Sequence, residues 1–216
     1  MPTLELLALQ LKPGISPTSP LLLRTISAVR AFVQTNSRFY TCLEDSSLLY
    51  ILGEWPSLDA HKAFLGGPER ESVLKPQDEL AEFVWCEHFE MEGRIGDVIP
   101  LEAQLLVLDR RWVKLKSCGK FEGVVRRYRE EVVMGSVGVV FDGWRVDQRE
   151  EEREYAMVSG WESREQHLQW RETTRRDVPE FAAVGRYYDV SKGEGGMEVV
   201  HLRDVEKMVA EGESVR

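Results

Sequence analysis

The first third of the chain alternates between short apolar runs and helical stripes of apolar residues. Residues 3–10 form a leucine-rich run that is typical of a buried strand. Ser19 and Pro20 suit the start of a helix, and the apolar stripe that follows at helical spacing is Leu22, Ile26, Val29 and Val33. Residues 38–43 and 48–55 are β-prone runs on either side of a polar turn, so they predict a hairpin.

A second helix and a fourth strand complete this first segment. Ser57 suits the start of the helix, and Gly66-Gly67-Pro68 interrupts it. Residues 83–91 then have the composition of a strand. The predicted order is β-α-β-β-α-β over a first module at residues 1–95, with a linker at about 92–100.

The same order of elements is predicted again in a second module, at residues 100–205. One helix is predicted by the apolar stripe Phe121, Val125, Tyr128 and Val132, and another helix is predicted to begin at Ser163. Its strands are predicted at residues 102–108, 137–146, 155–161 and 197–204, with a charged loop at 148–154 and an extra helical piece at 178–188. Residues 206–216 read as a polar tail.

A short pattern occurs twice and indicates an internal duplication. The matched residues are Trp55, Ser57 and His61 in the first copy, and Trp161, Ser163 and His167 in the second, 106 residues later. The two helical stripes match independently, at an offset of 99 residues. Matches of this kind are the signature of a repeated structural unit. The chain therefore reads as two versions of one module.

The repeated β-α-β-β-α-β order, with its Trp-x-Ser-x-x-x-His element after the third strand, resembles the dimeric α/β-barrel superfamily. Within it, the chain is similar to the antibiotic biosynthesis monooxygenase and stress-responsive A/B barrel families. The resemblance implies an α+β fold of two ferredoxin-like modules, each with one bare sheet face. We expect these faces to pack sheet to sheet, as an intramolecular pseudo-dimer that still allows a homodimer.

Composition narrows the classes of partner and the compartment. The formal net charge of −9 and the pI near 5.1 argue against nucleic acid and anionic membranes as partners. No apolar run is long enough to span a bilayer, and no targeting segment is evident. The three cysteines have no metal-type spacing, which favours free thiols in a reducing compartment. These features predict a cytoplasmic protein.

The histidines are the candidate catalytic residues. His88 lies in a fourth strand that the expected fold covers on both faces, so its imidazole must be hydrogen-bonded or face a cavity. Imidazole is also the side chain that titrates near neutral pH without help. We predict His88 and His61 as catalytic residues. The predicted substrate-binding residues are Trp55, Trp85, Tyr40, Tyr50, Phe64, His167, His201 and Trp161.

A purely structural reading of the same residues stays open. Ser57 and Ser163 cap helices, and each neighbouring tryptophan can anchor its helix by packing. The resemblance implies instead that the tryptophan lines a substrate cavity, and related polyketide cyclases pair a fourth-strand histidine with a tyrosine. The monooxygenase family also has an asparagine four residues before the tryptophan, where this chain has Ile51 and Met157. That departure counts against a literal copy of the family's oxygen chemistry.

The resemblance and the histidines predict a cofactor-independent monooxygenase, cyclase or isomerase. Its substrate would be a small aromatic or polyketide-like molecule in a pocket between sheet and helices. The first module is favoured, because Trp55, His61, Trp85 and His88 are all available there. No flavin, haem or metal signature is present, although folding could bring His61 and His88 together. The alternative is a non-catalytic barrel that binds an apolar ligand or a protein.

Overall fold

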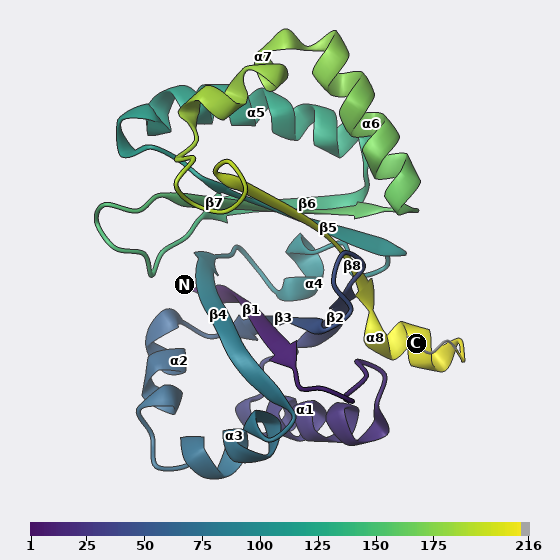
Figure 1. Ribbon diagram of the computed structural model, residues 1–216. Coiled ribbons are helices and arrows are strands. Elements are labelled where there is room, and N and C mark those ends of the chain that lie inside the picture. Colours follow the sequence, from purple (N-terminus) through teal and green to yellow (C-terminus); the bar gives the residue numbers. More distant parts are fainter. Residues whose placement is uncertain (213–216) are drawn as a thin grey trace. The chain divides into compact units, whose positions relative to one another are not determined.

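The structure is a computed structural model that describes residues 1–212, and it divides into two compact units (Figure 1). Met1–Ile95 with Leu202–Arg216 form the first unit, and Gly96–His201 form the second. Each unit combines sheet and helices with antiparallel strand pairs, which confirms the α+β class. No helix within residues 1–212 is long and apolar enough to cross a membrane.

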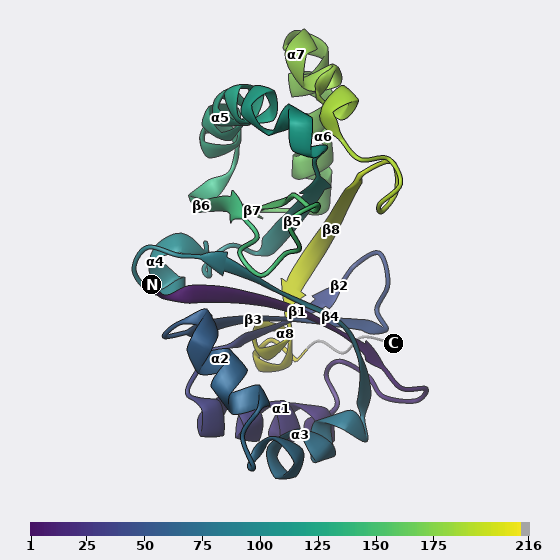
Figure 2. The same ribbon diagram turned by 90° about the vertical axis from the view of Figure 1, so that its left-hand side faces the viewer.

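The first unit has helices on one face of a sheet (Figures 1 and 2). Its elements are β1 (Thr3–Leu11), α1 (Pro20–Val33), β2 (Arg38–Cys42), β3 (Leu48–Trp55), α2 (Leu58–Leu65), α3 (Arg70–Asp78) and β4 (Ala81–Glu90). The strand order is β4-β1-β3-β2, and residues 202–204 pair with β2 at its edge. The break between α2 and α3 falls at Gly66-Gly67-Pro68, as the sequence predicts.

The core of the first unit lies between this sheet and α1. Leu22 and Ile26 of the predicted stripe are fully buried, and they belong to one apolar cluster with Leu49 and Ile51 of β3. A helix with such a stripe is stabilised mainly by burying it against a sheet. The same packing orients the helix-facing side of β1, β3 and β4, from which Glu5, Trp55 and His88 project.

The second unit has the same kind of layers (Figure 1). Its elements are α4 (Ile95–Val98), β5 (Leu105–Trp112), η1 (Leu115–Ser117), α5 (Cys118–Gly135), β6 (Val137–Trp144), β7 (Glu154–Trp161), α6 (Arg164–Asp177), α7 (Pro179–Ala182), η2 (Val184–Tyr187) and β8 (Met197–Asp204). The strand order is β8-β5-β7-β6. Phe121 and Val125 of the predicted stripe are buried in its apolar cluster. The predicted linker contains α4, and the extra helical piece is α7 with η2.

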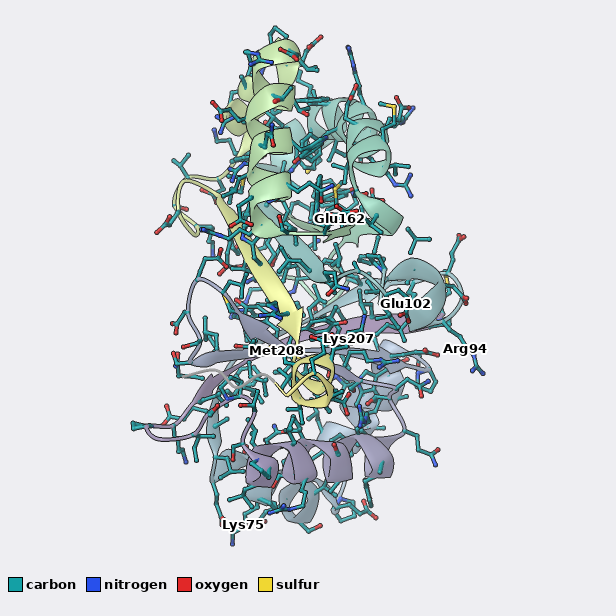
Figure 3. All side chains as sticks on the ribbon, turned by 90° about the vertical axis from the view of Figure 1, so that its right-hand side faces the viewer. Lys75, Arg94, Glu102, Glu162, Lys207 and Met208 are labelled. Atoms are coloured by element: carbon teal, nitrogen blue, oxygen red, sulfur yellow. The ribbon has the colours of Figure 1, made fainter. Side chains whose placement is uncertain are left out.

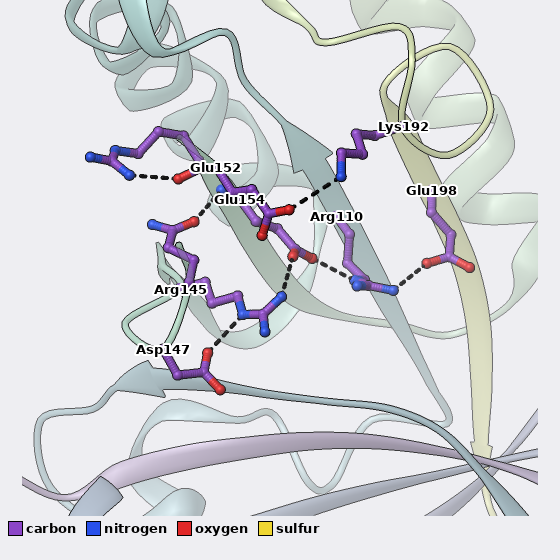
Figure 4. A network of polar contacts seen from close by, with 9 residues as sticks. Arg110, Arg145, Asp147, Glu152, Glu154, Lys192 and Glu198 are labelled. Atoms are coloured by element: carbon purple, nitrogen blue, oxygen red, sulfur yellow. Dashed lines mark hydrogen bonds and ion pairs between the residues drawn. The ribbon is translucent and has the colours of Figure 1, made fainter. Parts of the chain in front are cut away.

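The observed bounds of β5 differ from the predicted ones, and buried ion pairs explain why the strand continues beyond residue 108. The strand expected at residues 102–108 is observed at Leu105–Trp112, so it continues through two consecutive arginines. Arg110 Nε donates to Glu154 Oε1 at 2.8 Å, and its Nη1 donates to Glu198 Oε2 at 2.7 Å (Figure 4). Charges that look like the end of a strand are therefore paired inside it, which makes their burial tolerable.

The predicted polar tail begins with a short helix. Residues 205–210 form α8 (Val205–Ala210), on which Lys207 and Met208 are visible in Figure 3. The Asp204 side chain caps the helix by accepting from the Lys207 N–H at 2.9 Å. Met208 is buried, as is Val205. Residues 213–216 of the predicted tail lie outside the described residues.

Serine caps fix where α2 and α6 begin, and one of them gives a direct test. Ser163 Oγ accepts from the Gln166 N–H at 3.1 Å. We expect Ser163→Ala to lower the free energy of unfolding by about 1 kcal/mol, because an N–H of the first turn loses its acceptor. Urea unfolding measures this. Ser163→Asp keeps an acceptor and should stay near wild type, so an equal loss in both variants would contradict the capping role.

Candidate functional site

A cluster of titratable side chains lies between the sheet and α2 in the first unit. His61 lies in the first turn of α2, behind the cap that Ser57 makes to the Ala60 N–H at 3.1 Å. Glu5 of β1 and His88 of β4 are opposite each other in register, so both side chains point to the same face. All three of Glu5, His61 and His88 are buried.

Short contacts join the members of this cluster. His61 Nδ1 lies 2.6 Å from His88 Nε2, which makes the pair a hydrogen bond. Glu5 Oε2 lies 3.3 Å from His61 Nδ1 and 3.9 Å from His88 Nε2. Cys86 Sγ lies 3.8 Å from His88 Nε2. The described arrangement thus brings the two predicted catalytic histidines together, with a carboxyl and a thiol that the sequence did not single out.

Trp55 completes the cluster from the end of β3. Its indole Nε1 donates to Glu5 Oε2 at 2.9 Å, and its ring stacks on the His61 ring, with centroids 4.4 Å apart and planes 19° apart. Phe64 lies against the same indole at 5.8 Å. Burial raises the pKa of the Glu5 carboxyl above its ordinary value, although the bond from Trp55 and the charge of His88 oppose the shift.

These donors could also hold a metal ion. One ligand atom from each of Glu5, His61, Cys86 and His88 lies within 4.8 Å of all the others. Imidazole, thiolate and carboxylate are the usual zinc ligands in proteins. The spacing of these residues in the sequence gives no signal for such a site, because they come from β1, α2 and β4.

The second unit repeats the histidine pair without the carboxyl and the thiol. His167 Nδ1 lies 2.9 Å from His201 Nε2, and Trp161 Nε1 donates to Ser159 Oγ at 2.9 Å. Strand register places Val107 opposite Ser159, as Glu5 is opposite Gly53 in the first unit. The residue two before the strand histidine is Val199, where the first unit has Cys86. The acceptor for the indole N–H is therefore a serine here and a carboxyl there.

Three predicted substrate-binding residues lie on the other face of the first sheet. Tyr50 and Trp85 are both in register with Ala8 of β1, and Tyr40 is in register with Tyr50. Successive side chains of a strand alternate between faces, so all three point away from the face that carries His88. Tyr50 and Trp85 contact each other there, with ring centroids 5.8 Å apart.

A cavity of about 220 Å³ lies in the second unit, between β5 and the helices that cover it. Its wall is mostly aromatic and charged, and includes Asp109, Arg111, Tyr128, Trp170, Phe181 and Tyr188. Gly135, at the end of α5, lets the Trp170 indole approach, since a Cβ there would come within 2.3 Å of Trp170 Nε1. The sequence favoured a pocket in the first module instead.

A buried ion pair forms the polar part of the cavity wall. Asp109 and Arg111 are two apart on β5 and so share a face. Arg111 Nε donates to Asp109 Oδ1 at 2.9 Å, Nη2 donates to Oδ2, and the guanidinium lies over the Tyr128 ring at 4.4 Å. Although burial alone would lower the pKa of Arg111, the Asp109 carboxylate holds it well above its ordinary value. The wall therefore carries a permanently charged guanidinium that is paired with a carboxylate.

The two tyrosines of the wall stay protonated at neutral pH. Burial raises the pKa of Tyr188 to about 12 and raises that of Tyr128 as well, and the positive charge of Arg111 only partly opposes both shifts. Both phenols can therefore donate hydrogen bonds to an oxygen of a bound molecule. Sequence reasoning missed Asp109 and Arg111. They could have been found, because strand alternation places them on the same face as the buried Val107.

Comparisons with known proteins bear on the fold. No family model matches the chain, and no curated protein matches it. Among solved structures, a candidate monooxygenase from Fusobacterium nucleatum has a TM-score of 0.63 at 10% identity, over 94% of this chain and 92% of its own. An anthrone oxidase-like protein has a TM-score of 0.61 at 15% identity, over 94% and 91%.

A mutant chlorite dismutase from Candidatus Nitrospira defluvii has a TM-score of 0.59 at 8% identity, over 97% of this chain and 94% of its own. At such identities the likeness concerns the fold alone. It is consistent with the superfamily resemblance in the sequence, and it leaves the duplication a prediction. The chain thus shares its fold with proteins described as a candidate monooxygenase, an anthrone oxidase-like protein and a chlorite dismutase.

Proposed function

We propose that the protein is an oxidative enzyme that acts on a small aromatic or polyketide-type molecule held in the cavity of the second unit. The observation that carries the proposal is the cavity wall, where aromatic rings surround the buried Arg111 and two phenols. The fold neighbours support the oxidative class, since they include a candidate monooxygenase and an anthrone oxidase-like protein.

The size and lining of the cavity suit a flat ring compound that carries an oxygen. Its volume of about 220 Å³ lies below the roughly 300–1,000 Å³ of pockets for drug-sized ligands. Trp170 and Phe181 offer apolar surface for a ring, whereas Arg111, Tyr128 and Tyr188 offer hydrogen-bond donors. Arg111 uses two of its donor groups on Asp109, and a guanidinium has five N–H donors in total.

The chemistry that this wall favours is formation of an enolate or phenolate, which then reacts with dioxygen. Arg111 and the two tyrosines would stabilise the negative oxygen of that anion in a buried setting. We assign the proton acceptor to Asp109, the carboxylate at the same wall. At an activated CH₂, one atom of O₂ becomes the new carbonyl oxygen, and the other leaves as water with the two hydrogens. The substrate itself supplies the electrons, so the reaction needs no organic cofactor.

Two elements of the sequence reading stay predictions alongside this proposal. The assignment of His61 and His88 as catalytic residues is one, and the sheet-to-sheet packing of two ferredoxin-like modules is the other. His167 stacks behind the cavity wall, with its ring 6.1 Å from the ring of Trp170, which lines the wall. The proposal nevertheless rests on the side chains that form the wall.

The test uses anthrone as the probe, with oxygen uptake and product absorbance as the measurements. We expect one O₂ consumed for each carbonyl formed, and about a 100-fold lower kcat/KM in Tyr188→Phe, which loses one donor to the anion. Tyr187→Phe is the matched control, because Tyr187 is next in the chain and outside the cavity wall, and it should keep wild-type activity.

Two results would overturn the enzymatic proposal. Binding of anthrone under air without oxygen uptake would establish the alternative, a non-catalytic ligand-binding protein. Equal activity in Tyr188→Phe and Tyr187→Phe would move the reaction away from this cavity. Circular dichroism of each variant, together with its melting temperature, shows that the comparison is made on folded protein.

A further inference from the structure

We propose that Glu5, His61, Cys86 and His88 bind one divalent transition-metal ion, with zinc as the best fit, in the first unit. The four donor atoms come from β1, α2 and β4 and converge within 4.8 Å of one another. Three of these side chains are buried, and Cys86 is half-buried. The inference is independent of the proposed oxidation, which rests on the cavity of the second unit.

The distances between donors are close to those of a tetrahedral zinc site. Zinc bonds of about 2.0–2.3 Å place neighbouring ligand atoms roughly 3.3–3.8 Å apart. The observed separations are 3.3 Å from Glu5 Oε2 to His61 Nδ1, 3.9 Å from that oxygen to His88 Nε2, and 3.8 Å from His88 Nε2 to Cys86 Sγ. The 2.6 Å contact between the histidines must widen by about 0.7 Å to reach the tetrahedral range, which a small rotation of one imidazole provides.

The donor set also fits zinc in charge and in chemical type. A carboxylate and a thiolate carry two negative charges, so a divalent ion bound by them and by two neutral imidazoles leaves no net charge in a buried site. A thiolate ligand selects against magnesium and calcium, which prefer oxygen donors only. A site of two nitrogens, one sulfur and one oxygen therefore favours zinc or a chemically similar ion.

The residues around the donors hold them in place. Trp55 Nε1 donates to Glu5 Oε2 at 2.9 Å, and the Trp55 ring stacks on His61. Gly53 faces the carboxyl across the strand pair, where a Cβ would approach Ser37 Oγ to 3.0 Å and Glu5 Oε1 to 3.4 Å. Hydrogen bonds and packing of this kind orient metal ligands, and their loss typically weakens metal binding about 10- to 100-fold.

The second unit provides a control within the same chain. It keeps the histidine pair, His167 and His201, at 2.9 Å, but Val107 and Val199 replace the carboxyl and the thiol. Two imidazoles without further protein ligands make an incomplete zinc site. We therefore expect one ion for each chain, in the first unit.

The experiment measures zinc in the full-length protein after loading with zinc chloride and gel filtration. Elemental analysis should give about one zinc per chain in the wild type, and little in Cys86→Ser, Glu5→Gln or His88→Asn. His201→Asn is the matched control and should retain the full amount. Trp55→Phe removes only the indole donor, and should raise the Kd for zinc about 10- to 100-fold.

Cobalt provides a second readout that reports the ligands directly. The cobalt-loaded wild type should show a thiolate-to-metal charge-transfer band, and Cys86→Ser should lack it. The proposal is overturned if the loaded wild type holds no zinc. It is also overturned if Cys86→Ser and Glu5→Gln hold as much zinc as the wild type, or if His201→Asn loses the ion. Cys86→Ser changes one atom, so it keeps the test decisive even if His88→Asn does not fold.

Discussion

Arg110→Met is expected to lower the free energy of unfolding by about 3–5 kcal/mol. The Arg110 side chain is 4% exposed and joins two carboxylates, of which Glu154 is 2% exposed (Figure 4). Methionine fills much of the same volume but leaves Glu154 to its contact with the more exposed Arg145, 3.3 Å away. A buried carboxylate that loses its main partner keeps its desolvation cost, and this cost sets the size of the effect.

Urea unfolding of three variants separates burial of charge from loss of packing. Arg110→Met with Glu154→Leu removes both charges and should recover most of the lost stability, since an apolar pair can replace a buried ion pair at little cost. Arg176→Met is the exposed control, because its pair with Asp177 lies on the surface and its loss should leave stability near that of the wild type. Equal losses in Arg110→Met and Arg176→Met would refute the argument.

Trp161→Ala should be destabilising by a similar amount, about 3–5 kcal/mol. The Trp161 side chain is fully buried, and its ring lies 4.9 Å from that of His167 and 5.1 Å from that of Trp170. Alanine would leave a cavity at the point where α6 meets β7, and Ser159 would lose its bond from the indole. The apolar transfer term and the unfilled volume both contribute.

A graded series checks whether volume is the cause. Trp161→Phe keeps a ring at the site, and should cost clearly less than Trp161→Ala in calorimetric melting. Trp144→Ala is the partly exposed comparison in the same unit, and its smaller loss of buried area predicts a smaller drop in melting temperature. A loss for Trp144→Ala that equals or exceeds that for Trp161→Ala would contradict the assignment of Trp161 as the anchor of α6.

Local signals in the sequence predicted most elements of the fold. Helix starts at Ser57 and Ser163 were readable because a cap acts within three residues. The break after α2 was readable because Gly66-Gly67-Pro68 places three residues that disfavour a helix in succession. The bounds of β5 were not readable. Arg110 is tolerated because Glu154 and Glu198 reach it from other strands, and such long-range pairs leave no local pattern.

The candidate site was predictable only in part, for a similar reason. The sequence identified His61 and His88 as candidates, but it could not show that Glu5 and Cys86 join them, since that requires the register of β1 and β4. The face on which Trp85 lies could have been predicted from the sequence. Trp85 is three residues from His88, so simple alternation already places the two on opposite faces of the strand.

The space beside each repeated tryptophan is filled by one pair of facing strand residues. In the first unit the pair is Glu5 and Gly53, and in the second it is Val107 and Ser159, so both members of the pair differ. A route from the second pair to the first must pass through an unfavourable intermediate. Glutamate introduced at 107 beside an intact Ser159 must compete with the serine hydroxyl for the Trp161 N–H, which Ser159 already accepts. Glycine introduced first removes the acceptor of the Trp161 N–H. The two positions should therefore show strong epistasis, so a carboxyl can be installed in the second unit only by a paired replacement.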